Sequence, residues 1–333
     1  MPISEADIEK HADDIKTLKA ALNEVLFGKE ELIDLVVTGL LARGHILLEG
    51  LPGLGKTELV KGLSKTLKLE TKRIQFTPDL LPGDITGNPV LQETEKGREF
   101  VFQEGPLFAN LVLADEINRA SPKTQSALLE AMQEHRVTVL GETHQLPKPF
   151  YVLATQNPIE LEGTYPLPEA QLDRFLFKLD VTRNSAETLE QIVKGREMGV
   201  EPEVKEVMTG ETLQSMMDVV RKIYLPDVVA NYIARLVDGT HTGQSKTAEG
   251  IKFGASPRAA LGLASAAKAR ALIEGRVNAS FEDVKLVAIP VLSHRIILEY
   301  NARIDGKTGR QVVEELIAEI PTQALDVPNT LKA

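Results

Sequence analysis

One eight-residue segment combines glycines with a lysine and a threonine in the spacing G-x-x-x-x-G-K-[ST]. It runs from Gly50 to Thr57 and reads Gly-Leu-Pro-Gly-Leu-Gly-Lys-Thr. Glycines let backbone N–H groups wrap a phosphate chain, the amino group of Lys56 can reach the β- and γ-phosphates, and the Thr57 hydroxyl can bind Mg²⁺. This chemistry predicts a nucleotide site. We expect it to be lined by Gly50, Leu51, Pro52, Gly53, Leu54, Gly55, Lys56, Thr57 and Glu58.

Two adjacent acids end a short apolar run later in the chain. The run begins at Leu111 and leads into Asp115 and Glu116. A strand that delivers an aspartate at its carboxyl edge, beside a phosphate-binding loop, can place that aspartate on Mg²⁺. Glu116 can then polarise an attacking water. Adjacent acids are also common in surface turns, but the preceding phosphate-loop pattern favours the functional interpretation.

Three further polar residues could serve the same site. Asn157 follows the next apolar run, and its amide could orient water beside a γ-phosphate or simply form a turn before Pro158. Arg174 is either a surface charge or a residue that reaches the nucleotide of a neighbouring subunit. Arg258 follows Pro257 at a predicted helix start. A cation there gains nothing from the helix dipole, so phosphate contact is one purpose for it.

The elements that would position these residues alternate between strands and helices. Short apolar runs predict strands at 45–49, 72–76, 110–114, 150–154 and 175–179. Apolar residues at helical spacing predict helices at 5–27, 30–43, 58–67 and 122–135. Near-continuous apolar strands between helices indicate a parallel sheet covered on both faces.

Two segments interrupt this alternation, and the pattern changes after them. Residues 77–103 predict an inserted hairpin, and residues 136–147 predict a second hairpin with a Gly-Glu turn. From Ser185 onward we expect helices only, with Pro290 kinking or interrupting the last long one. Their expected ranges are 185–198, 211–223, 226–241, 257–274 and 280–299. We therefore predict an α/β domain at 1–183, a helical lid domain at 184–320 and a tail at 321–333.

Composition narrows the class of protein. A chain of 333 residues is long enough for about two domains. It has no cysteine, which excludes disulfides, thiolate zinc sites and cysteine nucleophiles. The net charge of −10 disfavours a general attraction to nucleic acid. The N-terminal residues lack the apolar core of a signal peptide, and no apolar run approaches a membrane span, so we expect a cytoplasmic protein.

Together these motifs resemble the AAA+ ATPases, and most closely the MoxR family in the clade with a helix-2 insert. The phosphate loop is similar to a Walker A motif, and residues 111–116 are similar to a Walker B motif. The stretch from Asp115 to Ala120 looks particularly MoxR-like. The resemblance covers about residues 22–300. It implies that Asp115 and Thr57 hold Mg²⁺, and that the other site residues are Lys56, Glu116 as catalytic base, Asn157 as sensor 1, Arg174 as arginine finger, Arg258 as sensor 2, and Phe27 and Gly28 at the adenine.

The same resemblance implies a fold and a function. The fold would be an α/β P-loop NTPase core with a parallel five-stranded sheet, followed by a small all-helical lid. The protein would hydrolyse ATP to ADP with Mg²⁺ in a ring, expected to be a hexamer, and remodel partner proteins that often carry von Willebrand factor A domains. The inserts at 77–103 and 136–147 are the candidates for the surface that transmits motion to the partner. A magnesium-chelatase-like motor subunit, a nucleic-acid translocase and a nucleotide-gated scaffold remain as alternatives.

Overall fold

The computed structural model describes residues 4–51, 53–94, 97–158, 164–197, 200 and 204–323. The chain forms two compact units, one of Asp13–Asp218 and one of Met1–Ala12 with Val219–Ala333. The first unit includes α7 (Ala186–Gly195) and most of α8 (Gly210–Lys222). The predicted domain limit at 183–184 instead follows the end of the sheet, and it stays a prediction about domain organisation.

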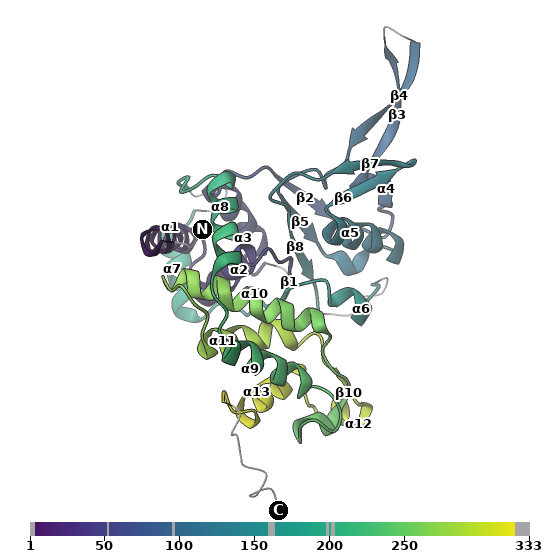
Figure 1. Cartoon of the computed structure of the whole chain (residues 1–333). Coiled ribbons are helices and arrows are strands. Elements are labelled where there is room, and N and C mark those ends of the chain that lie inside the picture. Colours follow the sequence, from purple (N-terminus) through teal and green to yellow (C-terminus); the bar gives the residue numbers. More distant parts are fainter. Residues whose placement is uncertain are drawn as a thin grey trace, which may run out of the picture. The chain divides into compact units, whose positions relative to one another are not determined.

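A five-stranded parallel sheet forms the centre of the first unit (Figure 1). The strand order is β2-β5-β8-β1-β9, and every neighbouring pair is parallel. This confirms the predicted sheet, and the predicted strand limits differ from the observed ones by at most two residues. The strands are β1 (Ile46–Glu49), β2 (Thr71–Gln75), β5 (Leu111–Asp115), β8 (Tyr151–Gln156) and β9 (Phe177–Asp180).

Helices pack on both faces of this sheet because successive strand residues point to opposite sides. Leu47 belongs to a buried cluster with Leu128 and Leu129 of α5 (Pro122–Glu134). Its neighbour Ile46 lies on the other face, close to Gly39 of α2 (Glu30–Leu41). Burying each of these leucine or isoleucine side chains contributes about 1.5–3 kcal/mol. This unit also contains α3 (Lys56–Thr66), α6 (Glu169–Leu172) and most of α1 (Glu5–Val25), which begins in the other unit.

Both predicted hairpins are present. The first, β3 (Gly87–Thr94) with β4 (Gly97–Glu104), is antiparallel and extends away from the sheet (Figure 1). The short helix α4 (Pro82–Thr86) precedes it and was not predicted, because five residues are too few to show helical periodicity. The ring of Phe102 on β4 stacks on His144 of the second hairpin, with centroids 3.8 Å apart.

The second hairpin joins β6 (Arg136–Val139) to β7 (Glu142–Gln145). Its turn residues are Leu140 and Gly141, which have φ values of 50° and 87°. A two-residue hairpin loop of this kind needs positive φ at both positions. The predicted Gly-Glu turn is therefore displaced by one residue, because Glu142 already pairs with Val139.

The second unit is mainly helical. Its helices are α9 (Asp227–Asp238), α10 (Pro257–Ile273), α11 (Phe281–Leu292), α12 (Tyr300–Ile304) and α13 (Gly309–Glu319). The expectation of helices only is wrong, because β10 (Ile251–Phe253) and β11 (Ile297–Leu298) form a small antiparallel pair. Pro290 lies inside α11, which ends soon after it at Leu292, so the predicted helix at 280–299 is too long. No helix in the described part of the chain is long and apolar enough to cross a membrane.

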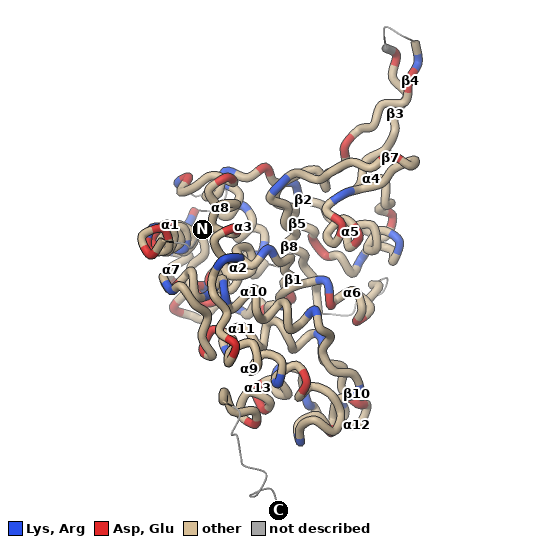
Figure 2. Tube along the Cα trace, in the orientation of Figure 1, with Lys and Arg blue, Asp and Glu red and all other residues tan. Residues whose placement is uncertain are grey.

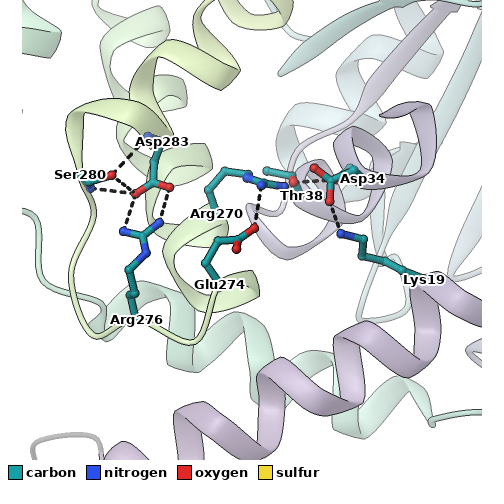
Figure 3. A network of polar contacts seen from close by, with 8 residues as sticks. All are labelled: Lys19, Asp34, Thr38, Arg270, Glu274, Arg276, Ser280 and Asp283. Carbon is teal, nitrogen blue, oxygen red and sulfur yellow. Dashed lines mark hydrogen bonds and ion pairs between the residues drawn. The ribbon is translucent and has the colours of Figure 1, made fainter. Parts of the chain in front are cut away.

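Polar contacts fix a helix start in one unit and join two helices in the other (Figure 3). In the second unit, Ser280 and Asp283 form a reciprocal cap at the start of α11. The guanidinium of Arg276 binds both carboxylate oxygens of Asp283, at 2.5 and 2.9 Å. In the first unit, Lys19 of α1 pairs with Asp34 of α2.

Candidate functional site

The predicted phosphate-binding loop connects β1 to α3 at the carboxyl edge of the sheet. Gly55 has a φ of 90° and occupies the N-cap position of α3 in the left-handed region, which glycine adopts without strain. Gly50 has no room for a side chain, because a Cβ there would lie 2.7 Å from the carbonyl oxygen of Val181. The conformation of the loop thus explains why glycine occupies positions 50 and 55. Leu51, Gly53 and Leu54 lie in this loop and Thr57 and Glu58 in the first turn of α3, whereas Pro52 lies outside the described residues.

Lys56 is buried at the start of α3. Its Nζ donates a hydrogen bond to the carbonyl oxygen of Gly50 at 2.7 Å, which holds the side chain over the loop. Burial lowers the pKa of Lys56, while the negative charges of Asp115 and Glu116 act in the opposite direction. The amino group therefore lies within electrostatic reach of both predicted acids.

Asp115 ends β5, and both of its carboxylate oxygens have donors. The Thr155 hydroxyl donates to Oδ1 at 2.6 Å, and Nη2 of Arg73 lies 2.7 Å from Oδ2. These contacts follow from strand alignment, since β5 pairs in parallel with β2 on one side and with β8 on the other. Carboxyl ends of parallel strands meet at one edge of a sheet, where α/β proteins place their ligands.

Glu116 has a φ of 56°, in the left-handed region that residues other than glycine rarely adopt. Its backbone N–H donates to the Thr155 hydroxyl at 2.8 Å, which helps to hold this conformation. Its carboxylate accepts from Nη1 of Arg119 at 2.9 Å and from Nε2 of Gln75 at 3.2 Å. Backbone strain of this kind is common at active sites and turns the Glu116 side chain away from the path of the strand.

Asn157 directly follows β8, so the structure places it at the same edge of the sheet. Its carbonyl oxygen accepts a hydrogen bond from Nδ2 of Asn118 at 3.3 Å. Asn118 belongs to the 3₁₀ helix η1 (Ile117–Arg119), which follows Glu116. The two polar segments are therefore tied to each other.

A pocket of about 540 Å³ adjoins the phosphate loop within the first unit. Phe27 lines it together with Gly53 and Gly55. Gly28 follows with a φ of 64°, which turns the chain beside the pocket. The guanidinium of Arg196 lies 5.4 Å from the centre of the Phe27 ring and also lines the pocket.

Neither of the two predicted arginines is among the described residues that line this pocket. Nη1 of Arg174 donates to the carbonyl oxygen of Leu129 at 2.7 Å, and Arg174 lines a second pocket of about 500 Å³ with Glu130, Glu134 and Arg136. The described residues that line the two pockets do not overlap. Arg258 is the exposed second residue of α10, in the second unit.

The oxygen donors at the site fit Mg²⁺. Thr57 offers a hydroxyl and Asp115 a carboxylate, and Mg²⁺ is commonly held by one or two such groups together with substrate phosphates. Within the described residues, no group of three or more His, Asp or Glu side chains could hold a metal by itself. The side chains at the site would therefore need further oxygen ligands, such as phosphates, to hold Mg²⁺.

Sequence reasoning missed several residues that surround these acids and the pocket. Arg73 and Gln75 belong to no motif, Arg119 lies in the stretch from Asp115 to Ala120 without a role assigned to it, and Thr155 precedes Asn157 by two residues. The two-residue repeat of a strand was the one available signal, because it places Arg73 and Gln75 on the same face of β2. The pocket residues Asn184, Ile192 and Arg196 follow the sheet in sequence and had no pattern to mark them.

Comparisons with known proteins agree with this geometry. Residues 45–177 match the family described as ATPase family associated with various cellular activities, and residues 244–316 match the AAA lid domain. The chain is 43% identical to the uncharacterized protein YeaC of Bacillus subtilis, over 91% of this chain and 93% of that protein. It is 40% identical to Chaperone MoxR1 of Mycobacterium tuberculosis, over 97% of this chain and 89% of that protein. A crystal structure of a proposed ATPase from Cytophaga hutchinsonii superposes with a TM-score of 0.88 at 41% identity, covering 95% of this chain and 97% of that one.

Proposed function

The chain belongs to the MoxR family of AAA+ ATPases, and from this premise we propose that it hydrolyses ATP to ADP with Mg²⁺ and uses the energy to remodel partner proteins. The observation that carries the proposal is the meeting of Lys56, Asp115 and Glu116 at one edge of the sheet. This edge continues into the pocket lined by Phe27. A phosphate chain on the loop would lie among these three side chains.

Each residue has a defined task in this proposal. Thr57 and Asp115 would hold Mg²⁺, and the bound ion would neutralise negative charge on the phosphates. Lys56 would leave the Gly50 carbonyl and bind the β- and γ-phosphates. Glu116 would accept a proton from the attacking water, and Asn157 would orient that water. Phe27 and Gly28 would contact the adenine.

We further propose that the site is shared between copies of the chain. Arg174 does not line the pocket beside its own phosphate loop. It lines a separate pocket, where its guanidinium group carries the positive charge of an arginine. Such an arginine can stabilise transition-state charge on a neighbour's nucleotide. This arrangement requires a ring, which we propose to be a hexamer. Arg258 would reach the nucleotide from the helical lid, with the two domains proposed as 1–183 and 184–320.

The partner is proposed to be a protein, often one with a von Willebrand factor A domain. The name of one relative, Chaperone MoxR1, supports a protein partner. Basic and acidic residues are interspersed along the elements of each unit rather than gathered in one segment (Figure 2). With a net charge of −10, this distribution gives no support to a nucleic-acid partner. We also propose a cytoplasmic location.

Phosphate release tests the hydrolytic part of this proposal. The full chain should release phosphate from ATP only with Mg²⁺, and its specific activity should rise with protein concentration. The variant Glu116→Gln should bind ATP but release phosphate at least about a thousandfold more slowly, because it keeps the shape of the side chain and loses the base. Activity in Glu116→Gln close to the wild-type value would remove Glu116 from the mechanism.

A further inference from the structure

We propose that Arg73 is a positioning residue for Asp115, and that its charge makes the binding of Mg²⁺ at this site depend on bound nucleotide. The inference rests on the proposed function, because it takes Asp115 as the carboxylate that holds Mg²⁺. Arg73 belongs to none of the sequence motifs, and its contact with Asp115 is visible only in the folded chain.

Strand alignment brings Arg73 to Asp115. β2 pairs with β5 so that Arg73 faces Leu113 and Gln75 faces Asp115. Side chains two residues apart on a strand share a face, so the long arginine side chain extends along that face to the end of β5. There its Nη2 atom lies 2.7 Å from Oδ2 of Asp115 and 2.9 Å from Oε1 of Gln75.

The two donors on Asp115 differ in charge. The Thr155 hydroxyl orients the carboxylate through Oδ1 without adding charge. The guanidinium of Arg73 binds Oδ2 and stays positively charged at any physiological pH. A metal ion that arrives at this carboxylate therefore meets a like charge already in contact with its ligand, and the repulsion weakens metal binding.

Exposure sets the size of this effect. The Arg73 side chain is 54% exposed and the Asp115 side chain 14% exposed, so the guanidinium can move away while the carboxylate stays in place. Solvent also screens an exposed charge. We therefore expect a moderate competition that a nucleotide can overcome, since its phosphates bring negative charge and further oxygen ligands.

This competition gives the site a selectivity. Within the described residues, no group of three or more His, Asp or Glu side chains could hold a metal without help. With Arg73 beside Asp115, free Mg²⁺ binds weakly to the single carboxylate. Mg²⁺ carried by a nucleotide binds more tightly, because the phosphates and the protein both supply oxygen ligands. Arg73 thus favours the metal–nucleotide complex over the free metal and keeps Asp115 oriented for it.

The test is a Mg²⁺ titration of the binding of a fluorescent, non-hydrolysable ATP analogue to the full chain. Arg73→Gln should lower the Mg²⁺ concentration at half-saturation about three- to tenfold, as expected for removal of one partly exposed charge near the metal. Arg73→Lys keeps the charge and should stay near the wild-type value. Lys72→Gln is the matched control, because Lys72 is exposed on the opposite face of β2 beside Glu70, and it should change nothing.

Several outcomes would overturn the inference. An unchanged or higher Mg²⁺ midpoint in Arg73→Gln would show that the charge does not compete with the metal. An equal loss of analogue affinity with Mg²⁺ and with EDTA would show that Arg73 binds phosphate directly. If Arg73→Gln fails to fold, as judged by thermal unfolding without ligand, Arg73→Met makes the same charge change with an apolar stem. Failure of the proposed function is distinguishable, because the wild-type chain would then not bind the analogue at any Mg²⁺ concentration.

Discussion

The hydroxyl of Thr155 donates to Oδ1 of Asp115 at 2.6 Å, and it accepts from the backbone N–H of Glu116 at 2.8 Å. One side chain on β8 therefore orients the proposed metal ligand on β5 and also stabilises the left-handed backbone of the proposed base. Thr155 is itself fully buried, so its hydroxyl has little access to competing water.

Removal of this hydroxyl should impair catalysis more than nucleotide binding. In Thr155→Val the shape is kept, but the buried N–H of Glu116 loses its acceptor, which should cost about 1–3 kcal/mol of stability. Loss of a residue that orients a metal ligand should lower kcat about 10- to 100-fold. Thr138→Val, at an exposed threonine on β6, is the control and should change neither value. Normal turnover in Thr155→Val would contradict the role given to Thr155.

Phe27 should contribute to nucleotide affinity without taking part in the chemistry. Its half-buried ring lines the pocket and faces the Arg196 guanidinium at 5.4 Å. Phe27→Ala should raise KM for ATP about tenfold and leave kcat nearly unchanged, because binding of this kind is equal in the ground and transition states. Phe27→Leu should show a smaller rise. A fall in kcat with constant KM would place Phe27 elsewhere in the cycle.

The core of the fold follows from sequence because its signals are local. Apolar strands between helices predicted the parallel sheet, and the glycine–lysine pattern located the loop whose φ values need glycine. Contacts such as Arg73 to Asp115 join residues 42 positions apart, and only the strand register makes them neighbours. β10 and β11 escaped notice because strands of three and two residues carry no periodicity.

Acid should destabilise the first unit through His45. This buried imidazole accepts at Nδ1 from the backbone N–H of Val152 and lies with Nε2 3.0 Å from the Met132 carbonyl oxygen, which suits the neutral form. Burial lowers the pKa of His45 from 6.5 to about 4. Between these values the unfolded chain binds the proton and the folded chain does not, so stability is present above pH 6.5 and falls as the pH falls toward 4.

Protonation of His45 should lower the free energy of unfolding by about 3 kcal/mol in total, because each unit of pKa difference between the folded and unfolded chain corresponds to about 1.4 kcal/mol. His45→Asn retains an acceptor for Val152 but cannot gain the proton. It should therefore be less stable than the wild type at pH 8 and should depend less steeply on pH between 6.5 and 4. Thermal unfolding across this range measures the difference, and parallel curves for the two proteins would contradict the assignment.

The first hairpin should tolerate changes at its outer residues. Phe100 is 71% exposed, whereas Phe102 on the same strand is half-buried against His144 and Phe108. Phe100→Ala should change stability by less than about 0.5 kcal/mol, and Phe102→Ala should cost about 1–3 kcal/mol because packed ring contacts are lost. Chemical unfolding of both variants checks this. Equal losses would mean that Phe100 is covered in solution.

We propose that two copies of the chain share each site, one supplying Glu116 and the other Arg174. Glu116→Gln and Arg174→Ala should each be nearly inactive alone. The decisive measurement is phosphate release by an equimolar mixture of these two variants at a concentration where the wild type is fully active. In mixed rings, an intact Glu116 from one variant meets an intact Arg174 from the other, so activity should rise well above the sum of the separate variants. A mixture no more active than that sum, with wild-type subunits shown to exchange under the same conditions, would contradict the shared site.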